Sequence, residues 1–229
     1  MRPKTIAEHR FEEVRKKLRG RTNREVFDFI YHSNLWASSE SPSGTGSEHD
    51  ATYRIRSQLP GLLKQLHAST LLDLPCGDFS WLSTVQLPVQ RYIGADIVPA
   101  IIERNAETYR DSHPFAEFRV LDLSGDPLPD ADVLFCRDCL VHLPCATIFD
   151  AFRNISRSRI SHVIMTTFVG NDRTNEDIET GNWRPLNFQK PPFSLPEPSR
   201  VIMEGCTEEN GAYADKALGL WHADQLTSM

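Results

Sequence analysis

Apolar residues recur at helical spacing in two early parts of the chain. They do so in residues 1–35 and again in residues 51–66. Between these parts, residues 37–50 read ASSESPSGTGSEHD, a polar stretch rich in serine and glycine that is typical of a loop. The pattern therefore predicts N-terminal helices, then a loop, then a further helix.

Beyond residue 68 the apolar positions fall into short runs of strand length. These runs alternate with helical segments, which predicts a parallel sheet with right-handed crossover connections. The last two runs are joined by a short polar turn and predict a hairpin at the sheet edge. The predicted strands are 69–74, 91–97, 117–123, 131–138, 161–168, 200–206 and 216–223, and the predicted helices between them are 78–85, 99–109 and 145–158.

The expected fold class is α/β. We predict a Rossmann-like, seven-stranded, mostly parallel sheet with a C-terminal antiparallel hairpin, helices on both faces and an N-terminal helical extension. The extension and its Gly/Ser-rich loop would occupy residues 1–50, and the ligand-binding domain residues 51–229. Residues 170–199 are rich in Asn, Asp, Pro and Gly and are too long for an ordinary connection. We expect this segment to cover the substrate.

Aspartates stand at the carboxyl ends of four successive predicted strands, at positions 73, 96, 122 and 138. In an open α/β sheet, ligands bind beyond these ends. Asp96, at the end of the second strand, is well placed to accept hydrogen bonds from ribose hydroxyls. The pattern indicates a ligand that contains a nucleoside.

The turn after the first strand, LDLPCGD, argues against a phosphorylated ligand. A dinucleotide site would use G-x-G-x-x-G, but this turn has only Gly77, and Asp73 and Asp78 would repel phosphate. A nucleoside with a cationic tail fits better. S-adenosylmethionine has a ribose, an ammonium and a sulfonium, and it has no phosphate.

Four motifs in order carry a resemblance to a known superfamily. With LLDLPCGDFSWL, YIGADIV, VLDLS and LFCRDCLVHLP, the chain resembles the class I S-adenosylmethionine-dependent methyltransferases over roughly residues 50–223. The segments SGTGS (43–47) and GNWRPLN (181–187) look similar to a poorly characterised bacterial and algal branch of it. The first motif departs from the usual pattern, because Pro75 and Cys76 stand where glycine is common.

The resemblance implies S-adenosylmethionine as cofactor and S-adenosylhomocysteine as product. The alternative for the acidic positions is that they cap helices that follow the strands. The resemblance assigns Asp73, Pro75, Gly77 and Asp78 to the methionine end, Asp96 to the ribose, Ile97, Asp122 and Leu123 to the adenine, and Arg137 with Asp138 to the donor methyl.

Pro75 has a further consequence for the cofactor. Proline removes one backbone N–H from the turn, so the cofactor carboxylate should depend on a side chain elsewhere. Arg56 is the first candidate and Arg54 the second, since an arginine pairs well with a carboxylate. A surface role for either arginine is the alternative.

The segment RDCLVHLP offers the candidate chemistry. Asp138 and His142 are four residues apart and would share a face if a helical turn starts there. His142 is the candidate general base, because its ordinary pKa of about 6.5 suits proton removal from an alcohol. Asp138 would orient it or hold a substrate amine. The alternative is a structural histidine bonded to backbone.

Aromatic and polar side chains indicate the acceptor. Tryptophan stacks on sugar or ring faces, and amide and charged groups bond hydroxyls, so we predict O-methylation of a sugar, glycan or other polyhydroxylated small molecule. The alternative functions are N-methylation of a small amine or amino-acid derivative and a non-catalytic module that binds the cofactor. For the 170–199 loop, the alternative is that it only packs against the domain. The predicted substrate residues are Trp36, Asn175, Asp177, Trp183, Arg184 and Asn187.

Two metal sites are considered and not favoured. The motif CRDC at 136–139 with Cys145 resembles part of a zinc set, but no fourth ligand is evident. Asp138 with either Asp172 or Asp177 could hold a hard divalent cation that activates a sugar diol.

Composition narrows the partners and the compartment. The net charge of −6 argues against a general nucleic-acid binder. No apolar run approaches the roughly 20 residues of a membrane span, and the first residues lack the apolar centre of a secretory signal. Five cysteines, an odd number, indicate reduced thiols. We expect a cytoplasmic protein with no membrane or nucleic-acid partner.

Overall fold

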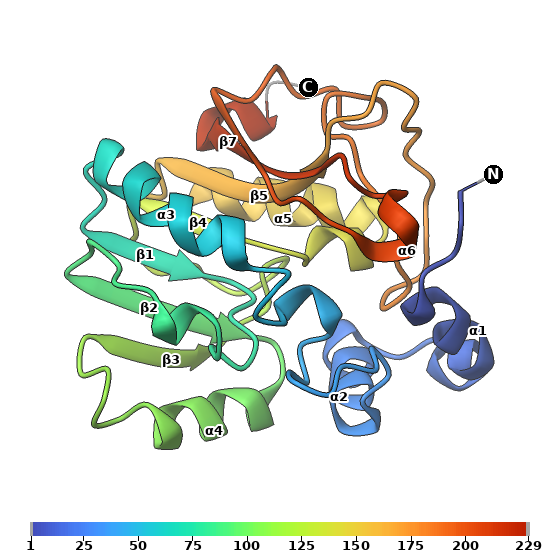
Figure 1. The fold of residues 1–229 in the computed structure, drawn as a ribbon, viewed down its shortest axis with the longest axis horizontal. Helices are drawn as coiled ribbons and strands as arrows, with labels where there is room; N and C mark the ends of the chain where they lie inside the picture. The colour runs from blue at the N-terminus through green and yellow to red at the C-terminus, as the bar shows by residue number, and fades with distance from the viewer. Residues whose placement is uncertain (1, 228–229) are drawn as a thin grey trace.

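A computed structural model describes residues 2–227. It contains one seven-stranded sheet in the order β3-β2-β1-β4-β5-β7-β6 (Figure 1). Strands β1 to β5 are parallel to one another, whereas β7 runs antiparallel to both β5 and β6. The strands are β1 Thr70–Asp73, β2 Arg91–Asp96, β3 Ala116–Val120, β4 Val133–Cys136, β5 His162–Phe168, β6 Arg200–Met203 and β7 Lys216–His222. The predicted Rossmann-like sheet with its C-terminal hairpin is confirmed.

Helices cover both faces of the sheet. Buried strand residues are nearly continuous rather than alternating, as expected when both faces are covered. The α-helices are α1 Ile6–Leu18, α2 Asn23–Ser33, α3 Tyr53–Gln65, α4 Pro99–Thr108, α5 Cys145–Arg157 and α6 Glu208–Gly211; short 3-10 turns are Thr45–Ser47, Leu82–Thr84, Leu140–His142 and Ala223–Thr227.

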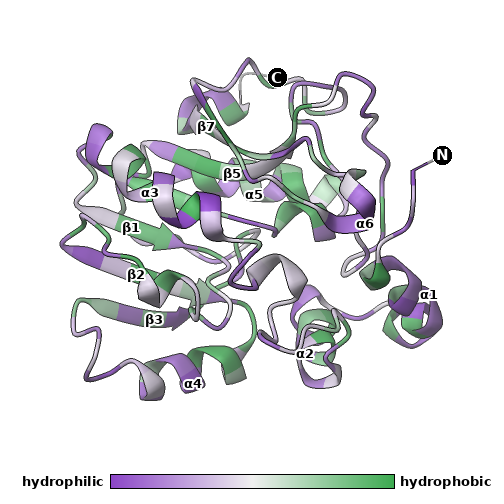
Figure 2. Ribbon diagram, viewed as in Figure 1, coloured by the Kyte–Doolittle hydropathy of each residue, from purple (hydrophilic) through white to green (hydrophobic). Residues whose placement is uncertain are grey.

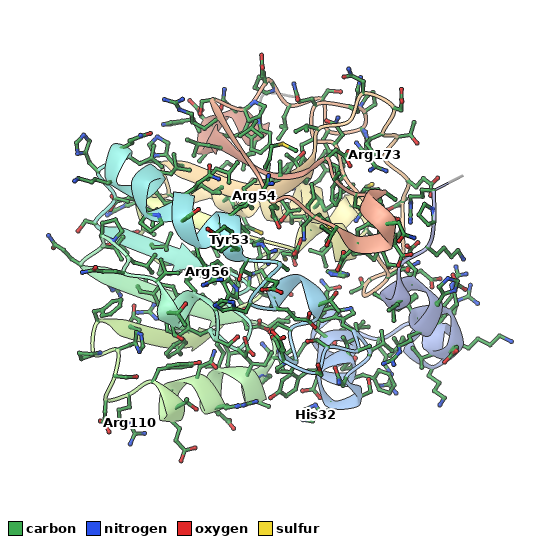
Figure 3. The ribbon with its side chains drawn as sticks, viewed as in Figure 1. His32, Tyr53, Arg54, Arg56, Arg110 and Arg173 are labelled. Carbon is green, nitrogen blue, oxygen red and sulfur yellow. The ribbon has the colours of Figure 1, made fainter. Side chains whose placement is uncertain are left out.

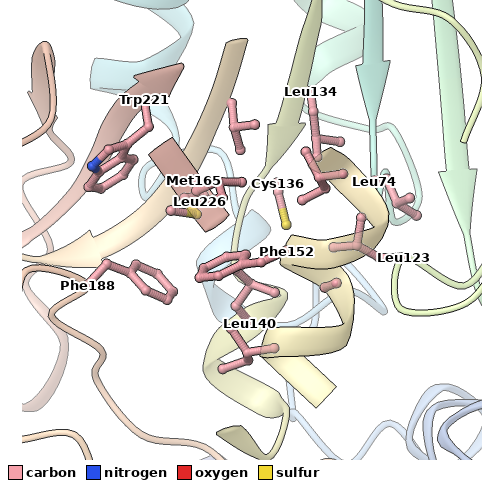
Figure 4. Packing of buried hydrophobic residues seen from close by; sticks show 14 of the residues in the cluster. Leu74, Leu123, Leu134, Cys136, Leu140, Phe152, Met165, Phe188, Trp221 and Leu226 are labelled. Carbon is pink, nitrogen blue, oxygen red and sulfur yellow. The ribbon is translucent and has the colours of Figure 1, made fainter. Parts of the chain in front are cut away.

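The two faces have separate cores because successive strand residues point to opposite sides. On one face, Leu71 packs in a cluster with Ile55 and Leu59 of α3. On the other face, Leu72 belongs to a cluster that includes Phe152 of α5. Figure 4 shows Phe152 at the centre of this second cluster, where Cys136, Met165, Phe188 and Trp221 also lie.

The helix predicted at 78–85 is wrong. The structure has only the 3-10 turn Leu82–Thr84 in this stretch. Gly77 and Phe79 both have positive φ angles, of 54° and 58°, which interrupt a right-handed helix. The side chain of Asp78 bonds the backbone N–H of Ser80 at 3.2 Å, so it forms a local turn instead.

The two N-terminal helices begin at capping boxes and share a small core. Thr5 caps α1 with Glu8, and Thr22 caps α2 with Glu25. Figure 2 shows α1 as largely hydrophilic, with hydrophobic residues on part of it. The shared core contains Phe11, Leu18, Val26, Ile30 and Leu35. Strands β1–β3 point toward these helices (Figure 1), so the helices face the edge where ligands bind in such sheets.

Candidate functional site

A cavity of about 990 Å³, counting solvent at its mouth, lies at the carboxyl ends of β1, β2 and β4. Residues from α2 and from the 42–47 loop close its other side. Sheets of this kind bind ligands at these strand ends. The structure brings the following predicted cofactor residues to this first cavity: Asp73, Pro75, Gly77, Asp96, Ile97, Asp122, Leu123 and Arg137.

Asp96 is fixed by backbone donors at the end of β2. Its carboxylate accepts hydrogen bonds from the N–H of Gly77 at 3.2 Å and from that of Val98 at 3.0 Å. Burial raises the pKa of Asp96 to about 6, and these backbone donors oppose that rise. The carboxylate thus ties β2 to the turn after β1 while it lines the cavity.

Asp73 lies at the end of β1 and is almost fully buried. The hydroxyl of Tyr92, on the neighbouring strand β2, donates a hydrogen bond to its Oδ2 at 2.6 Å. Burial, reinforced by the nearby Asp96 carboxylate, raises the pKa of Asp73 to about 8. At neutral pH this carboxyl is therefore mostly protonated.

The Gly/Ser-rich loop packs directly on the turn that follows β1. The Ser43 hydroxyl accepts a hydrogen bond from the backbone N–H of Asp78 at 3.0 Å. A Cβ built on Gly77 would lie 2.3 Å from Ser43 Oγ, so only glycine allows this approach. Gly77 and Ser43 both line the cavity, and Ser43 packs against the turn.

A second cavity, of about 1030 Å³ with its solvent, adjoins the first. Its walls come from the start of the chain, the 43–46 loop, the end of β5 and the segment around α6. Trp183 and Tyr213 supply aromatic surface at a ring-centroid distance of 4.8 Å. The residues that line both cavities are Trp36, Ser43, Asp138 and His142.

His142 stands at the junction of the two cavities. Its Nδ1 lies 2.9 Å from the carbonyl oxygen of Asn182, and because a carbonyl only accepts, Nδ1 carries the proton. Nε2 then has the lone pair. Burial lowers the pKa of His142 to about 4, so the ring is neutral at ordinary pH but is a weaker base than its ordinary pKa of about 6.5 suggested. The ring also stacks on Trp36 at 4.8 Å.

Asp138 does not orient His142 in the way the spacing suggested. The turn there is 3-10 rather than α-helical, Asp138 has a φ of 52°, and the carbonyl of Asn182 holds the ring instead. Lys216 donates to Asp138 Oδ2 at 2.7 Å, and Arg137 lies 3.3 Å from the same oxygen. Although burial opposes it, these two cations lower the pKa of Asp138 well below its usual range, so it is an ionised carboxylate.

Two residues predicted for the cofactor lie elsewhere. Arg56 is on α3 (Figure 3), and its Nη2 donates to the carbonyl of His49 at 3.0 Å. Asp78 bonds the hydroxyl of Ser80 at 2.8 Å. Neither Arg56 nor Asp78 lines the two cavities formed by the described residues. Both side chains form local hydrogen bonds instead.

The 170–199 segment holds itself in place with most of the polar residues predicted to bind substrate. Arg184 is fully buried and donates to the carbonyls of Leu140 and Leu143 at 2.9 and 2.6 Å. Asn175 exchanges hydrogen bonds with the backbone of Asn187 at 2.9 Å. Of the predicted substrate residues, Trp183 lines the second cavity and Trp36 both, whereas Arg184, Asn175, Asn187 and Asp177 line neither.

The described residues contain no group of three or more His, Cys, Asp or Glu side chains arranged to hold a metal ion. Asp138 is paired with Lys216, as above, and Asp177 accepts from the backbone N–H of Cys145 at 2.8 Å.

The helices formed by the described residues are all too short or too polar to cross a bilayer.

Sequence reasoning missed several residues of the two cavities. Lys216 begins a predicted strand, and its pairing with Asp138, 78 residues away along the chain, is not visible in the sequence. Ser43 had only its glycine-rich surroundings as a signal. Glu208 and Ile6 gave none, because they belong to segments far away in the chain that meet only in the folded protein.

The chain resembles known proteins in its fold and not in its sequence. No protein-family model matches the chain, and no curated protein matches it by sequence. Among solved structures, it is similar to N-methyltransferase NodS from Bradyrhizobium japonicum WM9 in complex with S-adenosylhomocysteine. The TM-score is 0.58 at 16% identity, covering 84% of this chain and 97% of that one.

Two further structures are similar over most of the chain. Magnesium protoporphyrin IX methyltransferase from Synechocystis PCC 6803 with bound S-adenosylmethionine has a TM-score of 0.58 at 11% identity, covering 89% of this chain and 98% of that one. The methyltransferase domain of a bacterial Hen1 protein has a TM-score of 0.56 at 14% identity, covering 75% and 98%. The chain therefore has the fold of the class I S-adenosylmethionine-dependent methyltransferases.

Proposed function

We propose that the protein is an S-adenosylmethionine-dependent methyltransferase that methylates a hydroxyl group of a sugar, glycan or other polyhydroxylated small molecule. The observation that carries this proposal is the pair of adjoining cavities, which share His142 and Asp138. One cavity would take the cofactor and the other the acceptor, so that the two reacting groups meet beside His142. Holding reactants close and aligned is the main task in methyl transfer.

The residues of the first cavity fit the cofactor. Asp96 would accept hydrogen bonds from the ribose hydroxyls. The apolar side chains of Ile97 and Leu123 would contact the adenine, and the buried Asp73 would face the ammonium. When bound, S-adenosylmethionine supplies a methyl group activated by its sulfonium, because the thioether S-adenosylhomocysteine is a good leaving group.

His142 would act as the general base. Its neutral ring and its Nε2 lone pair would take the proton of the acceptor hydroxyl as the new C–O bond forms. Trp36 and Trp183 would offer faces on which a sugar ring stacks. This role depends on the tautomer that the Asn182 carbonyl selects.

A second candidate is N-methylation of a small amine. It is favoured by the carboxylates of Glu208 and Glu209, which line the second cavity together with Asp138. An amine needs no strong base, so His142 would then be dispensable. The likeness to an N-methyltransferase in fold is compatible with this chemistry and does not select it.

Calorimetry and product analysis test the proposal. The full chain should bind S-adenosylmethionine, and Asp96→Ala should weaken binding by about 10- to 100-fold, as expected for lost charged hydrogen bonds. The exposed Asp111→Ala is the matched control and should bind normally. Mass spectrometry with labelled cofactor and a panel of sugars, amines and phenols would identify the methylated atom. A folded protein that does not bind the cofactor would refute the proposal, whereas one that binds it but methylates nothing would be a binding module.

A further inference from the structure

The first cavity is polarised along the row of strand ends. Near β2 and β3 its walls are mainly apolar, with Ile97, Ile101 and Leu123. Beside β4 stands Arg137, which is the only arginine or lysine among the described residues that line this cavity. We propose that Arg137 binds the carboxylate of the cofactor's methionine end, a role that rests on the proposed function.

Arg137 is buried yet has donors to spare. Its side chain is 4% exposed, Nη2 donates to Glu204 at 2.7 Å, and Nη1 lies 3.3 Å from Asp138. Nε has no hydrogen-bond partner among the described residues. A guanidinium has five N–H donors, and a buried donor without a partner is destabilising. Nε itself is shielded from the cavity, but Arg137 lines the cavity, and its remaining Nη N–H groups would donate to a ligand carboxylate there.

The order of the strands gives the direction of the ligand. Asp96 ends β2, Asp73 ends β1, and Arg137 follows β4, and these three strands are neighbours in that order. With the ribose at Asp96 and the adenine toward Asp122, the amino-acid end extends toward β1 and β4. Asp73 then meets the ammonium and Arg137 the carboxylate, each with the complementary charge.

The amino-acid end of the ligand would leave the charge balance at this point unchanged. Arg137 and Lys216 are balanced by Asp138 and Glu204, which lie within 3.4 Å of them. The carboxylate of the ligand brings its own ammonium, so the bound amino-acid end adds no net charge. Arg56, the candidate suggested by sequence, lies outside the cavity and leaves this position to Arg137.

A ligand that lacks the carboxylate tests the assignment. Calorimetry on the full chain would compare S-adenosylmethionine with decarboxylated S-adenosylmethionine, and we expect about 10- to 100-fold weaker binding of the latter. The double variant Arg137→Met with Glu204→Met removes both partners of the pair, so no unpaired charge from that pair stays buried. It should bind the two ligands equally. Arg137→Lys, which keeps the charge but loses the planar fork, should reduce the difference.

Two controls separate the carboxylate from the rest of the ligand. Asp96→Asn should weaken both ligands by the same factor and keep their ratio, and Arg56→Ala should change neither affinity. Equal affinity of the wild type for both ligands, or an unchanged ratio in the folded Arg137→Met/Glu204→Met variant, overturns the proposal. If the folded wild type binds neither ligand, the proposed function fails instead. Thermal unfolding verifies that each variant is folded.

Discussion

Aspartates at equivalent strand ends differ in protonation because their neighbours differ. Burial raises the pKa of Asp73 to about 8, and no cation among the described residues is in hydrogen-bond contact with it. Burial raises the pKa of Asp96 only to about 6, because backbone donors oppose the rise. Asp138 is only partly buried, and Lys216 and Arg137 keep it ionised. Asp73 is thus a protonated carboxyl at neutral pH, Asp96 is a hydrogen-bond acceptor, and Asp138 is a fixed negative charge.

Asp73 should release a proton when the cofactor binds. With a pKa of about 8, the Asp73 carboxyl is mostly protonated at pH 7. The ammonium of the bound cofactor would lower this pKa, because a nearby positive charge favours the carboxylate. Calorimetry at pH 7 in buffers of different ionisation enthalpy should show release of about one proton, declining as the pH rises above 8. Asp73→Asn should abolish the release. Zero release or proton uptake by the wild type would contradict the assignment.

His142 should make turnover insensitive to pH where an ordinary histidine titrates. Because its pKa is lowered to about 4, the base is neutral at higher pH and is lost only as the pH falls toward 4. At saturating cofactor and acceptor, kcat should therefore show no step near pH ~6.5. His142→Ala should lower kcat by about 10²- to 10⁴-fold.

The exposed His9→Ala is the control for this variant and should keep full activity. A kcat that falls with a midpoint near pH ~6.5, or one that His142→Ala leaves unchanged, argues against the general base. The second result would favour N-methylation.

Among the elements, the 170–199 segment shows how a long connection without helices or strands in the described chain is kept ordered. Its polar side chains bond backbone groups, including those of the 3-10 turn that carries His142. Gly181 donates its N–H to the carbonyl of His142 at 2.8 Å, and the Asn182 carbonyl holds the imidazole. The segment therefore positions the candidate base, and we propose that it also covers the acceptor through Trp183.

Arg184 should be important for stability. Replacement by Met leaves the buried carbonyls of Leu140 and Leu143 without their donors, so we expect the free energy of unfolding to fall by roughly 3 kcal/mol. Urea denaturation measures this loss. The exposed Arg159→Met should change stability little. A similarly small change in Arg184→Met would mean that water replaces the guanidinium.

At the scale of the whole molecule, the second cavity exists because distant parts of the chain converge. The Tyr213 hydroxyl donates to the carbonyl of Pro3 at 2.5 Å and accepts a hydrogen bond from Arg2 at 3.1 Å. These contacts hold the start of the chain against the segment before β7. The first cavity has no wall from residues 2–8, so the two cavities can be altered separately.

Enlarging Ile6 should affect the acceptor alone. Ile6 is 55% exposed and lines only the second cavity. Ile6→Trp should raise the KM for an acceptor found in the panel by about tenfold, equivalent to roughly 1.4 kcal/mol of lost binding, and leave the Kd for S-adenosylmethionine unchanged. Val201→Trp, on β6 and outside both cavities, is the control. Weaker cofactor binding in Ile6→Trp would show that the cavities are not independent.

Much of the frame was predictable from sequence because it depends on local patterns. Apolar runs and their spacing predicted each strand of the sheet, and the strand ends at Asp73 and Asp96 followed from them. The absence of a helix at 78–85 was not predictable, since the positive φ angles at Gly77 and Phe79 that prevent it are not visible in the apolar spacing. Arg184 and Arg56 look like binding residues in sequence, where burial and hydrogen-bond partners are invisible.

The sequence by itself determined the order of the strands and helices and the acids at the strand ends, since both follow from residue type and period along the chain. Only the tertiary structure decided which charges meet. Lys216 reaches Asp138, Glu204 reaches Arg137, and Asn182 sets the tautomer of His142, each across a long separation in sequence. Protonation and hydrogen bonding depend on distances of a few ångströms and on exclusion of water, and both arise only when the sheet, the hairpin and the 170–199 segment pack together.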